Sequence, residues 1–381
     1  MSTRMNSMSS NSSKTNDPKA GLYTQLGGYV GFDSISEQIQ KKFLKRGFHL
    51  NIILVGKRYT FFLLFQLLIF LWFPGESGMG KSTFVNTLFS AHLLDSKGRT
   101  SSAQPNRKTV NIEPVSHVLK ENGVKLRLTI VDTPGYGDQV NNERCWEPII
   151  TYIKDQHGAY LKKELTATRD RFIEDTRIHL CLFFISPTGH SLKPIDILVL
   201  QKLVEVVNVV PVIAKSDCLT PAEKIAFKNR IKTEIEYHGI NLYPYASPED
   251  DDDDREINQA IRDFLPFAIV GSELLIDVDG AKVRGRKTRW GAINVEDPEH
   301  CEFVQLREFI TRSHLQDLIE TTQHRHYESF RSQQIMAFTN ASQHSSRIAR
   351  PTSPPSHHGS YTSLSTGKPS SPGSMSHHNL G

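Results

Sequence analysis

The strongest chemical signal in the sequence is the octapeptide Gly75-Glu76-Ser77-Gly78-Met79-Gly80-Lys81-Ser82. It fits the phosphate-binding pattern G-x-x-x-x-G-K-[ST], although an ordinary glycine-rich turn can match it as well. Glycines let backbone N–H groups curl around a β-phosphate, a helix N-terminus adds positive charge, a lysine reaches the β and γ oxygens, and a hydroxyl ligates Mg²⁺. The predicted phosphate-binding residues are Gly75, Ser77, Gly78, Gly80, Lys81, Ser82 and Thr83, with Ser82 also on the metal.

A second candidate element, Asp132-Thr133-Pro134-Gly135, follows the apolar run at residues 126–131. A carboxylate at the carboxyl end of a strand can hold a Mg²⁺-bound water, and the N–H of Gly135 is placed to meet a γ-phosphate. The loop after Gly135 would then distinguish a triphosphate from a diphosphate. As a lone tetrapeptide this motif would mean little.

The third candidate element is Ala214-Lys215-Ser216-Asp217, which ends an apolar run at residues 209–213. An aspartate here can accept hydrogen bonds from both the ring N–H and the amino group of guanine, which adenine cannot match. Lys215 would lie along the base and brace the loop. Alone, Lys, Ser and Asp after a strand are typical of a surface turn. Following the other two motifs in order, Asp217 indicates GTP rather than ATP.

The segments between these loops alternate between predicted strands and predicted helices, as is typical of an α/β protein. Short β-branched runs at residues 52–55, 126–131, 180–185 and 207–214 alternate with longer helical patterns. This alternation predicts a mostly parallel central sheet with helices on both faces. Each of the three motifs then lies at the end of a strand.

Composition gives few clues about partners. The net charge of +4 is too small to argue for nucleic acid, and the four cysteines show neither zinc-site spacing nor the density of a secreted scaffold. The polar residues 1–20 contain no apolar core of a signal peptide. We therefore expect a cytoplasmic protein that binds no nucleic acid.

Residues 61–73 are apolar at 12 of 13 positions, yet they are fewer than the ~20 residues that a membrane-spanning helix needs. Gly56-Lys57-Arg58 can be encoded by codons containing GTAAG, and Pro74-Gly75 by codons containing CCAG, which are the ends of an intron. We therefore hypothesise that residues 57–74 are translated from a retained intron. The alternatives are a hydrophobic loop for membrane or partner contact and a first strand drawn from residues 67–73.

Longer phrases over roughly residues 22–325 resemble the septin family. The resemblance rests on the following segments: Gly28-Tyr29-Val30-Gly31-Phe32, Val131-Asp132-Thr133-Pro134-Gly135-Tyr136-Gly137-Asp138, Phe184-Ile185-Ser186-Pro187-Thr188-Gly189-His190, Leu192-Lys193-Pro194 with Asp196, the strand and base-reading motif at residues 209–217, Leu265-Pro266-Phe267-Ala268-Ile269-Val270-Gly271-Ser272, and Val283-Arg284-Gly285-Arg286 with Trp290-Gly291. So many ordered matches are highly specific.

The resemblance implies a P-loop GTPase domain with a septin-specific C-terminal extension, and GTP or GDP with Mg²⁺ as its ligands. It implies that Gly271 and Arg286 contact or cover the guanine. Thr109 resembles the first-switch threonine near the γ-phosphate and the metal, and with Lys81 it is a candidate catalytic residue. Any hydrolysis should be slow, because Tyr136 follows Gly135 where fast signalling GTPases carry a glutamine that orients water.

The resemblance also implies assembly with other septins through a nucleotide-side interface and an opposite, nucleotide-free one. His190 and Glu223 fall where septins reach a neighbour's nucleotide, and Trp290 resembles a marker of the nucleotide-free interface. Each has a plainer reading, as a loop cap or a surface residue. The chain departs from the family at residues 287–289 and at Cys218, which replaces a common threonine, so partner choice is open.

A basic stripe precedes the first strand. Lys41, Lys42, Lys45 and Arg46 recur at helical spacing along one side, and septins carry a phosphoinositide-binding segment here, so we expect contact with an anionic membrane surface. The alternative is a solvated helix end. Six consecutive acids at residues 249–254 predict a solvated loop or helix start, or an electrostatic contact for a basic segment.

We therefore expect three regions in the chain: a disordered N-terminus at residues 1–21, a GTP-binding domain at residues 22–325, and a disordered Ser/Pro/His-rich tail at residues 326–381 without a coiled coil. The sequence thus resembles a short, fungal-type septin that polymerises into cortical filaments or rings in cytokinesis and morphogenesis. The rival functions are a monomeric signalling or translational GTPase and a membrane-inserted protein that relies on residues 61–73.

Overall fold

The computed structural model describes residues 34–57, 78–94, 112–136, 143–166, 173–246, 251–278, 280–288 and 291–348. The chain divides into two compact units, Met1–Arg331 and Ser332–Gly381. The first unit carries all the strands of the described residues. Residues 1–21 and nearly all of the suspected insertion at residues 57–74 lie outside the described ranges.

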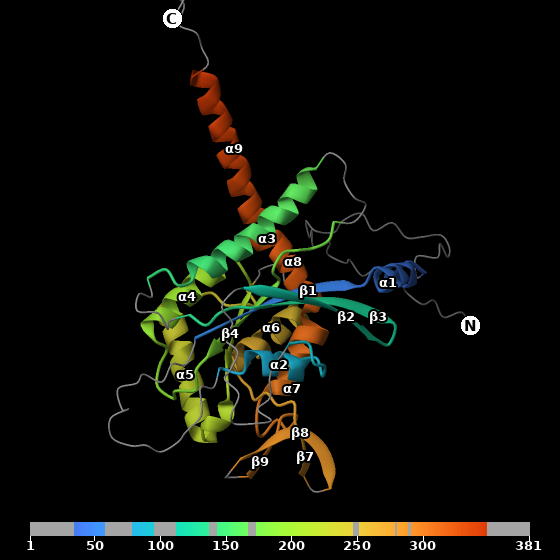
Figure 1. Cartoon of the computed structure of the whole chain (residues 1–381), viewed down its shortest axis with the longest axis vertical. Coiled ribbons are helices and arrows are strands. Elements are labelled where there is room, and N and C mark those ends of the chain that lie inside the picture. Colours follow the sequence, from blue (N-terminus) through green and yellow to red (C-terminus); the bar gives the residue numbers. More distant parts are fainter. Residues whose placement is uncertain are drawn as a thin grey trace, which may run out of the picture. The chain divides into compact units, whose positions relative to one another are not determined.

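A six-stranded sheet in the order β2-β3-β1-β4-β5-β6 forms the centre of the first unit (Figure 1). Its strands are β1 (Phe48–Gly56), β2 (Glu113–Glu121), β3 (Val124–Asp132), β4 (Leu180–Ile185), β5 (Val209–Ile213) and β6 (Phe267–Ala268). All neighbours pair in parallel except the β2-β3 hairpin. The mostly parallel sheet and the strand positions predicted from the β-branched runs are confirmed.

Helices pack on both faces of this sheet because its buried strands are apolar on both sides. In β1, Leu50, Ile52 and Leu54 belong to one hydrophobic cluster, whereas Ile53 and Val55 belong to another. The first cluster includes side chains of α2 (Lys81–Leu88), α7 (Phe303–Glu308) and α8 (Leu315–Thr321). The second includes side chains of α3 (Glu147–Leu165), α4 (Pro194–Val204) and α5 (Pro221–Tyr237).

A second, antiparallel sheet of three strands follows the main one, in orange in Figure 1. It consists of β7 (Leu275–Val278), β8 (Ala281–Thr288) and β9 (Gly291–Asn294). Gly285 allows this meander to approach its neighbours closely, because a Cβ there would lie 2.1 Å from the carbonyl oxygen of Ile293. The remaining elements are α1 (Ser34–Arg46), the 3₁₀ turn Ser216–Cys218, α6 (Asp252–Phe264), the π-helical segments Phe309–Ser313 and Thr322–Tyr327, and α9 (Glu328–Ile348).

Two expectations about polar segments have different outcomes. The acidic run continues as the first turn of α6, whose Asp252, Asp253 and Asp254 are exposed, as predicted for a solvated helix start. The predicted disorder from residue 326 is wrong for its first part, because α9 spans Glu328–Ile348. Residues 349–381 lie outside the described part of the chain. Within the described ranges, no helix combines the length and apolarity needed to span a bilayer.

Candidate functional site

The phosphate loop ends where α2 begins. Gly80 lies in the left-handed region at φ 78°, which a glycine adopts without strain, and Lys81 is the first residue of the helix. A Cβ added at Gly78 or Gly80 would meet no described atom within 4 Å. Ser82 and Thr83 lie in the first helical turn, whereas Gly75 and Ser77 fall outside the described residues.

Lys81 links the phosphate loop to the second motif. Its Nζ donates to the carbonyl oxygen of Thr133 at 2.7 Å and lies 3.5 Å from Oδ1 of Asp132. Burial lowers the pKa of Lys81, while the Asp132 carboxylate opposes that effect. The ammonium is therefore held beside the residues that end β3, and its contact with phosphate oxygens stays a prediction.

Thr133 fixes the second motif to the sheet. Its buried hydroxyl donates to the carbonyl oxygen of Leu54 at 2.7 Å, and Leu54 pairs with Asp132 in the β1-β3 register. Asp132 consequently lies at the level where β1 approaches the phosphate loop. The donor set suits Mg²⁺, which combines few protein oxygens with phosphate and water oxygens. Among the described residues, no group of three or more His, Cys, Asp or Glu offers a rival metal site.

The base-reading motif follows β5 in a strained turn. Lys215 adopts a left-handed φ of 49°, which starts the 3₁₀ turn that presents Asp217. The carboxylate of Asp217 pairs with the guanidinium of Arg286 on β8. Two residues that the sequence assigned to guanine thus meet, although they are far apart in the chain.

Gly271 lies between the phosphate-loop helix and the base-reading turn. A Cβ at Gly271 would lie 3.1 Å from the Cα of Phe84 in α2, so this position favours glycine for packing reasons alone. Two residues earlier, the carbonyl oxygen of Ile269 accepts a hydrogen bond from the N–H of Ser216 at 3.0 Å. The segment after β6 therefore connects both halves of the site.

The meander that carries Arg286 is tied to α2. Ser272 donates through its hydroxyl to the carbonyl oxygen of Gly285 at 2.6 Å, and Thr87 donates to the carbonyl oxygen of Ser272 at 3.1 Å. Arg284 donates to the carbonyl oxygen of Thr87 at 3.1 Å. The sequence assigned no role to Ser272 or Thr87. These bonds fix β8 relative to the phosphate-loop helix, and so limit where Arg286 can reach.

Tyr136 makes a contact that sequence analysis also missed. Its hydroxyl donates to Oδ1 of Asp196 at 2.9 Å, and its backbone forms a parallel bridge with Lys57 after β1. Asp196 stood in the sequence only as part of the family resemblance, with Leu192-Lys193-Pro194. Its other oxygen caps α4 by accepting from the N–H of Lys193 at 3.4 Å. No local pattern indicated Tyr136 as its partner.

His190 and Glu223, two of the residues expected to face a neighbouring subunit, are exposed. His190 lies on the surface in the loop before α4. Glu223 is exposed too, and it accepts hydrogen bonds from the N–H and hydroxyl of Thr220 as the capping box of α5. Cys218 is exposed beside Asp217, and partial burial raises the pKa of its thiol. Thr109 and Trp290 lie outside the described residues.

The basic stripe lies on α1. Its four cations are on one helix of 13 residues and all are exposed: Lys41, Lys42, Lys45 and Arg46. Lys41 lies 3.6 Å from Glu37, an exposed pair that contributes little.

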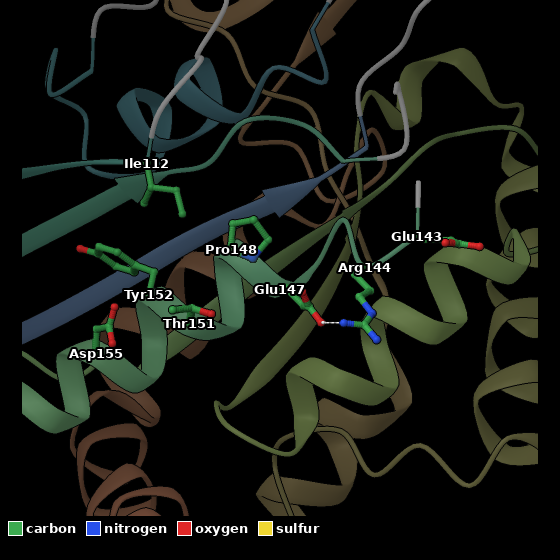
Figure 2. A pocket seen from close by; sticks show the side chains of 8 residues that line it. All are labelled: Ile112, Glu143, Arg144, Glu147, Pro148, Thr151, Tyr152 and Asp155. Carbon is green, nitrogen blue, oxygen red and sulfur yellow. Dashed lines mark ion pairs between the residues drawn. The ribbon is translucent and has the colours of Figure 1, made fainter. Parts of the chain in front are cut away.

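A cavity of about 630 Å³ opens beside the start of β2 and the first turns of α3 (Figure 2). Its charged side chains are mostly acidic, and Arg144 pairs with Glu147 at 3.5 Å. The lining residues are Ile112, Glu143, Arg144, Glu147, Pro148, Thr151, Tyr152 and Asp155. None of the predicted nucleotide-binding residues is among them, so this cavity is not the candidate nucleotide site.

Comparison with known proteins gives one family. The sequence model named Septin matches residues 65–344. The chain is 54% identical to Septin homolog spn2 of Schizosaccharomyces pombe over 326 residues, covering 86% of this chain and 93% of that protein. It is 48% identical to Cell division control protein 10 of Saccharomyces cerevisiae, covering 84% of this chain and 94% of that protein.

Similarity extends to animal proteins and to a solved structure. Neuronal-specific septin-3 of Danio rerio is 48% identical, with 83% of this chain and 82% of that protein covered. The crystal structure of the Septin GTPase domain from Chlamydomonas reinhardtii aligns with a TM-score of 0.49 at 23% identity, covering 74% of this chain and 98% of that chain.

Proposed function

The chain belongs to the septin family, and on this premise we propose that it is a guanine-nucleotide-binding subunit that polymerises with other septins. The filaments or rings would act at the cell cortex as a scaffold in cytokinesis and morphogenesis. Curated relatives named for cell division control support this role. Two contacts carry the nucleotide part of the proposal: Lys81 of the first motif bonds to Thr133 of the second, and Asp217 of the third pairs with Arg286 on β8.

Phosphate binding would rest on Lys81 and the start of α2. Lys81 stands partly buried beside Asp132, with side chains only 13% and 17% exposed, so its charge is poorly screened by water. The free N–H groups of the first helical turn add a positive field in the same direction. Gly75, Ser77, Gly78, Gly80 and Thr83 are proposed to contribute to the same cradle.

The metal site is proposed to use Ser82, Asp132 and Thr109. Mg²⁺, when bound, would neutralise charge on the β- and γ-phosphates. In the described part of this site, Asp132 is held in register by Thr133 and Leu54, and Ser82 is held by the first turn of α2. Both oxygens thus come from rigid elements, and Thr109 is proposed to join them.

Guanine recognition is proposed for Asp217, with Lys215, Gly271 and Arg286 around it. Asp217 presents acceptor oxygens only, which match the two adjacent donors of guanine. Arg286 pairs with this carboxylate from β8, which supports a role for it beside a base bound to Asp217. Hydrolysis, with Thr109 and Lys81 as catalytic residues, is proposed to be slow, so that the nucleotide mainly stabilises subunit contact.

Replacing Lys81 with Ala tests the phosphate-loop assignment. We expect the purified variant to lose its bound GDP or GTP, because the one side-chain charge directed at the phosphates is removed. Nucleotide released by acid is quantified by anion-exchange chromatography. Lys162→Ala, at an exposed position on α3, is the control and should retain its nucleotide. Unchanged nucleotide content in Lys81→Ala would contradict the assignment.

Salt dependence separates a filament subunit from a monomeric signalling or translational GTPase. We expect the chain, with its partner septins, to sediment as polymers when salt is lowered and to dissolve when salt is raised. Light scattering and pelleting measure both states. A chain that remains monomeric and fully soluble at low salt with its partners present would favour the monomeric switch.

A further inference from the structure

Tyr136 directly follows Gly135, and both its side chain and its backbone make contacts that fix its position. Its side chain is 4% exposed, and its ring stacks on Phe183 with centroids 6.0 Å apart and planes at 25°. Its hydroxyl donates to Oδ1 of Asp196 at 2.9 Å. Burial raises the pKa of Tyr136 well above its ordinary value, so the phenol stays a hydrogen-bond donor at physiological pH.

The acceptor of this bond is part of a rigid element. Asp196 lies in the first turn of α4, where its Oδ2 accepts from the N–H of Lys193. The helix is packed into the core through Val199, Leu200 and Leu203. A side chain bonded to Asp196 is therefore fixed relative to the sheet.

The backbone of Tyr136 is fixed independently. It forms an isolated parallel bridge with Lys57, the first residue after β1 and of the suspected insertion, so in a chain without the insertion the bond to Asp196 is the anchor that remains. Gly135 thus lies between Thr133, bonded to Leu54, and Tyr136, bonded to Asp196. Glycine has the widest conformational freedom of any residue, so the direction of the Gly135 N–H depends on how firmly its neighbours are fixed.

We propose that Tyr136 is a positioning residue for Gly135 and that, anchored by Asp196, it sets this chain's preference for a guanosine triphosphate over a diphosphate. The inference rests on the proposed nucleotide-binding function. Gly135 contacts only the terminal phosphate in that scheme, so loosening it weakens triphosphate binding and leaves diphosphate binding unchanged. A purely structural role for Tyr136 would weaken both equally, through stability.

A matched control exists within the chain. Tyr243 is also almost fully buried, at 1% exposure, and its hydroxyl also donates to a carboxylate, that of Asp317. Asp317 lies on α8, and neither residue belongs to the three nucleotide motifs. Removing the Tyr243 hydroxyl therefore deletes the same kind of bond without touching Gly135.

The experiment compares Tyr136→Phe, Asp196→Asn and Tyr243→Phe with the unmodified chain. Calorimetric titration of nucleotide-stripped protein measures binding of GDP and of a non-hydrolysable GTP analogue. We expect the triphosphate-to-diphosphate affinity ratio to fall about tenfold in Tyr136→Phe, the effect of about one lost hydrogen bond. Asp196→Asn retains an acceptor oxygen and should give a smaller fall, and Tyr243→Phe should keep the ratio.

Thermal unfolding of the same variants separates stability from selectivity. Tyr136→Phe and Tyr243→Phe should lower the melting temperature by similar amounts, and only Tyr136→Phe should change the ratio. If both Tyr136→Phe and Asp196→Asn still bind GDP and keep the triphosphate-to-diphosphate affinity ratio of the unmodified chain, the inference about Tyr136 is overturned, whereas the proposed nucleotide binding stands. Absence of binding to either nucleotide in the unmodified chain would instead overturn the proposed function.

Discussion

Asp217 is the residue proposed to determine base selectivity. Its carboxylate is only 9% exposed and faces Arg286, so an amide in its place would lose a charge-assisted contact in a site with little water. Asp217→Asn also presents a donor where guanine has donors. We expect this variant to bind GTP more weakly by about 2 kcal/mol or more. A titration panel of GTP, ITP, XTP and ATP measures it.

XTP in the nucleotide panel serves as a control for the base-reading role of Asp217. The asparagine variant should gain affinity for XTP relative to GTP, because xanthine carries an acceptor where guanine carries its amino group. Asp277→Asn on β7 offers a matched change at a carboxylate outside the three motifs and should leave the panel unchanged. A guanine preference that survives in Asp217→Asn would remove the base-reading role.

Two buried histidines make stability depend on pH. Burial, with Arg177 and His326 nearby, lowers the pKa of His157 to about 3, and burial with Arg325 lowers the pKa of His326 to about 4. The folded state therefore binds fewer protons than the unfolded state, whose histidines titrate at about 6.5. Stability is fully present above that pH and is lost as the pH falls below it.

As the pH falls from 7.5 to 5.5, each of the two histidines should lower the free energy of unfolding by about 1.4 kcal/mol. Urea unfolding at the two pH values measures this loss. His157→Phe keeps an aromatic ring beside Tyr327 and Phe330. This variant should lose only the part of the pH-dependent change that comes from His157, which is about half of the change expected from His157 and His326 together. The exposed His190→Phe should not change it. A variant of His157 with the full pH dependence would contradict this assignment.

At the scale of elements, α1 is the proposed membrane contact. Its four cations, all exposed, should each contribute about 1 kcal/mol near an anionic leaflet, so neutralising all four should remove roughly 4 kcal/mol of attraction. We expect the quadruple Gln variant of Lys41, Lys42, Lys45 and Arg46 to stop sedimenting with phosphoinositide-containing liposomes while it retains its nucleotide. Binding by the unmodified chain should weaken as salt rises.

A charge-matched variant controls for net charge. Replacing four exposed lysines elsewhere removes the same charge and should leave liposome binding in place: Lys120, Lys125, Lys162 and Lys163. If the α1 variant still sediments fully, also when the insertion is removed, α1 is a solvated helix and not the membrane contact.

At the scale of the whole molecule, the interruption of the first motif decides whether this chain folds as its relatives do. The two sides of residues 57–74 come together, since a Cβ at Gly56 would lie 3.4 Å from Cε of Met79. This proximity is expected of any insertion at this point of the fold, and the proposal that the inserted segment is a retained intron rests on the codons at its ends. A chain that lacks the 19 codons from within Gly56 to within Gly75, so that a single glycine joins Val55 to Glu76, should bind nucleotide at least as tightly and unfold at a higher temperature.

Sequencing the transcript and mass analysis of the filament give the independent measurement. The main message should lack these codons, and the filament subunit should lack the corresponding peptides. A message that retains them as the main species, together with a joined variant that fails to bind nucleotide, would refute the proposal. In that case the apolar loop would be part of the working protein.

The sequence alone determined the family, the mostly parallel sheet and the three loops at its edge. Those features are encoded locally, because a glycine pattern, a strand-ending carboxylate and an apolar run each act through neighbours in the chain. The same reasoning missed β2, whose side chains alternate between exposed and half-buried and include few large apolar residues. The residues of α9 were also predicted to be disordered, because their polar composition was given more weight than the helical spacing of their apolar residues.

Only the tertiary structure decided which distant groups meet. Arg286 reaches Asp217 because Ser272 and Arg284 tie its strand to α2, and Tyr136 reaches Asp196 because β1 and α4 lie on either side of it. Such contacts depend on crossover connections and on packing across the sheet. A single sequence has no period or spacing that records them, since each partner is locally compatible with many others.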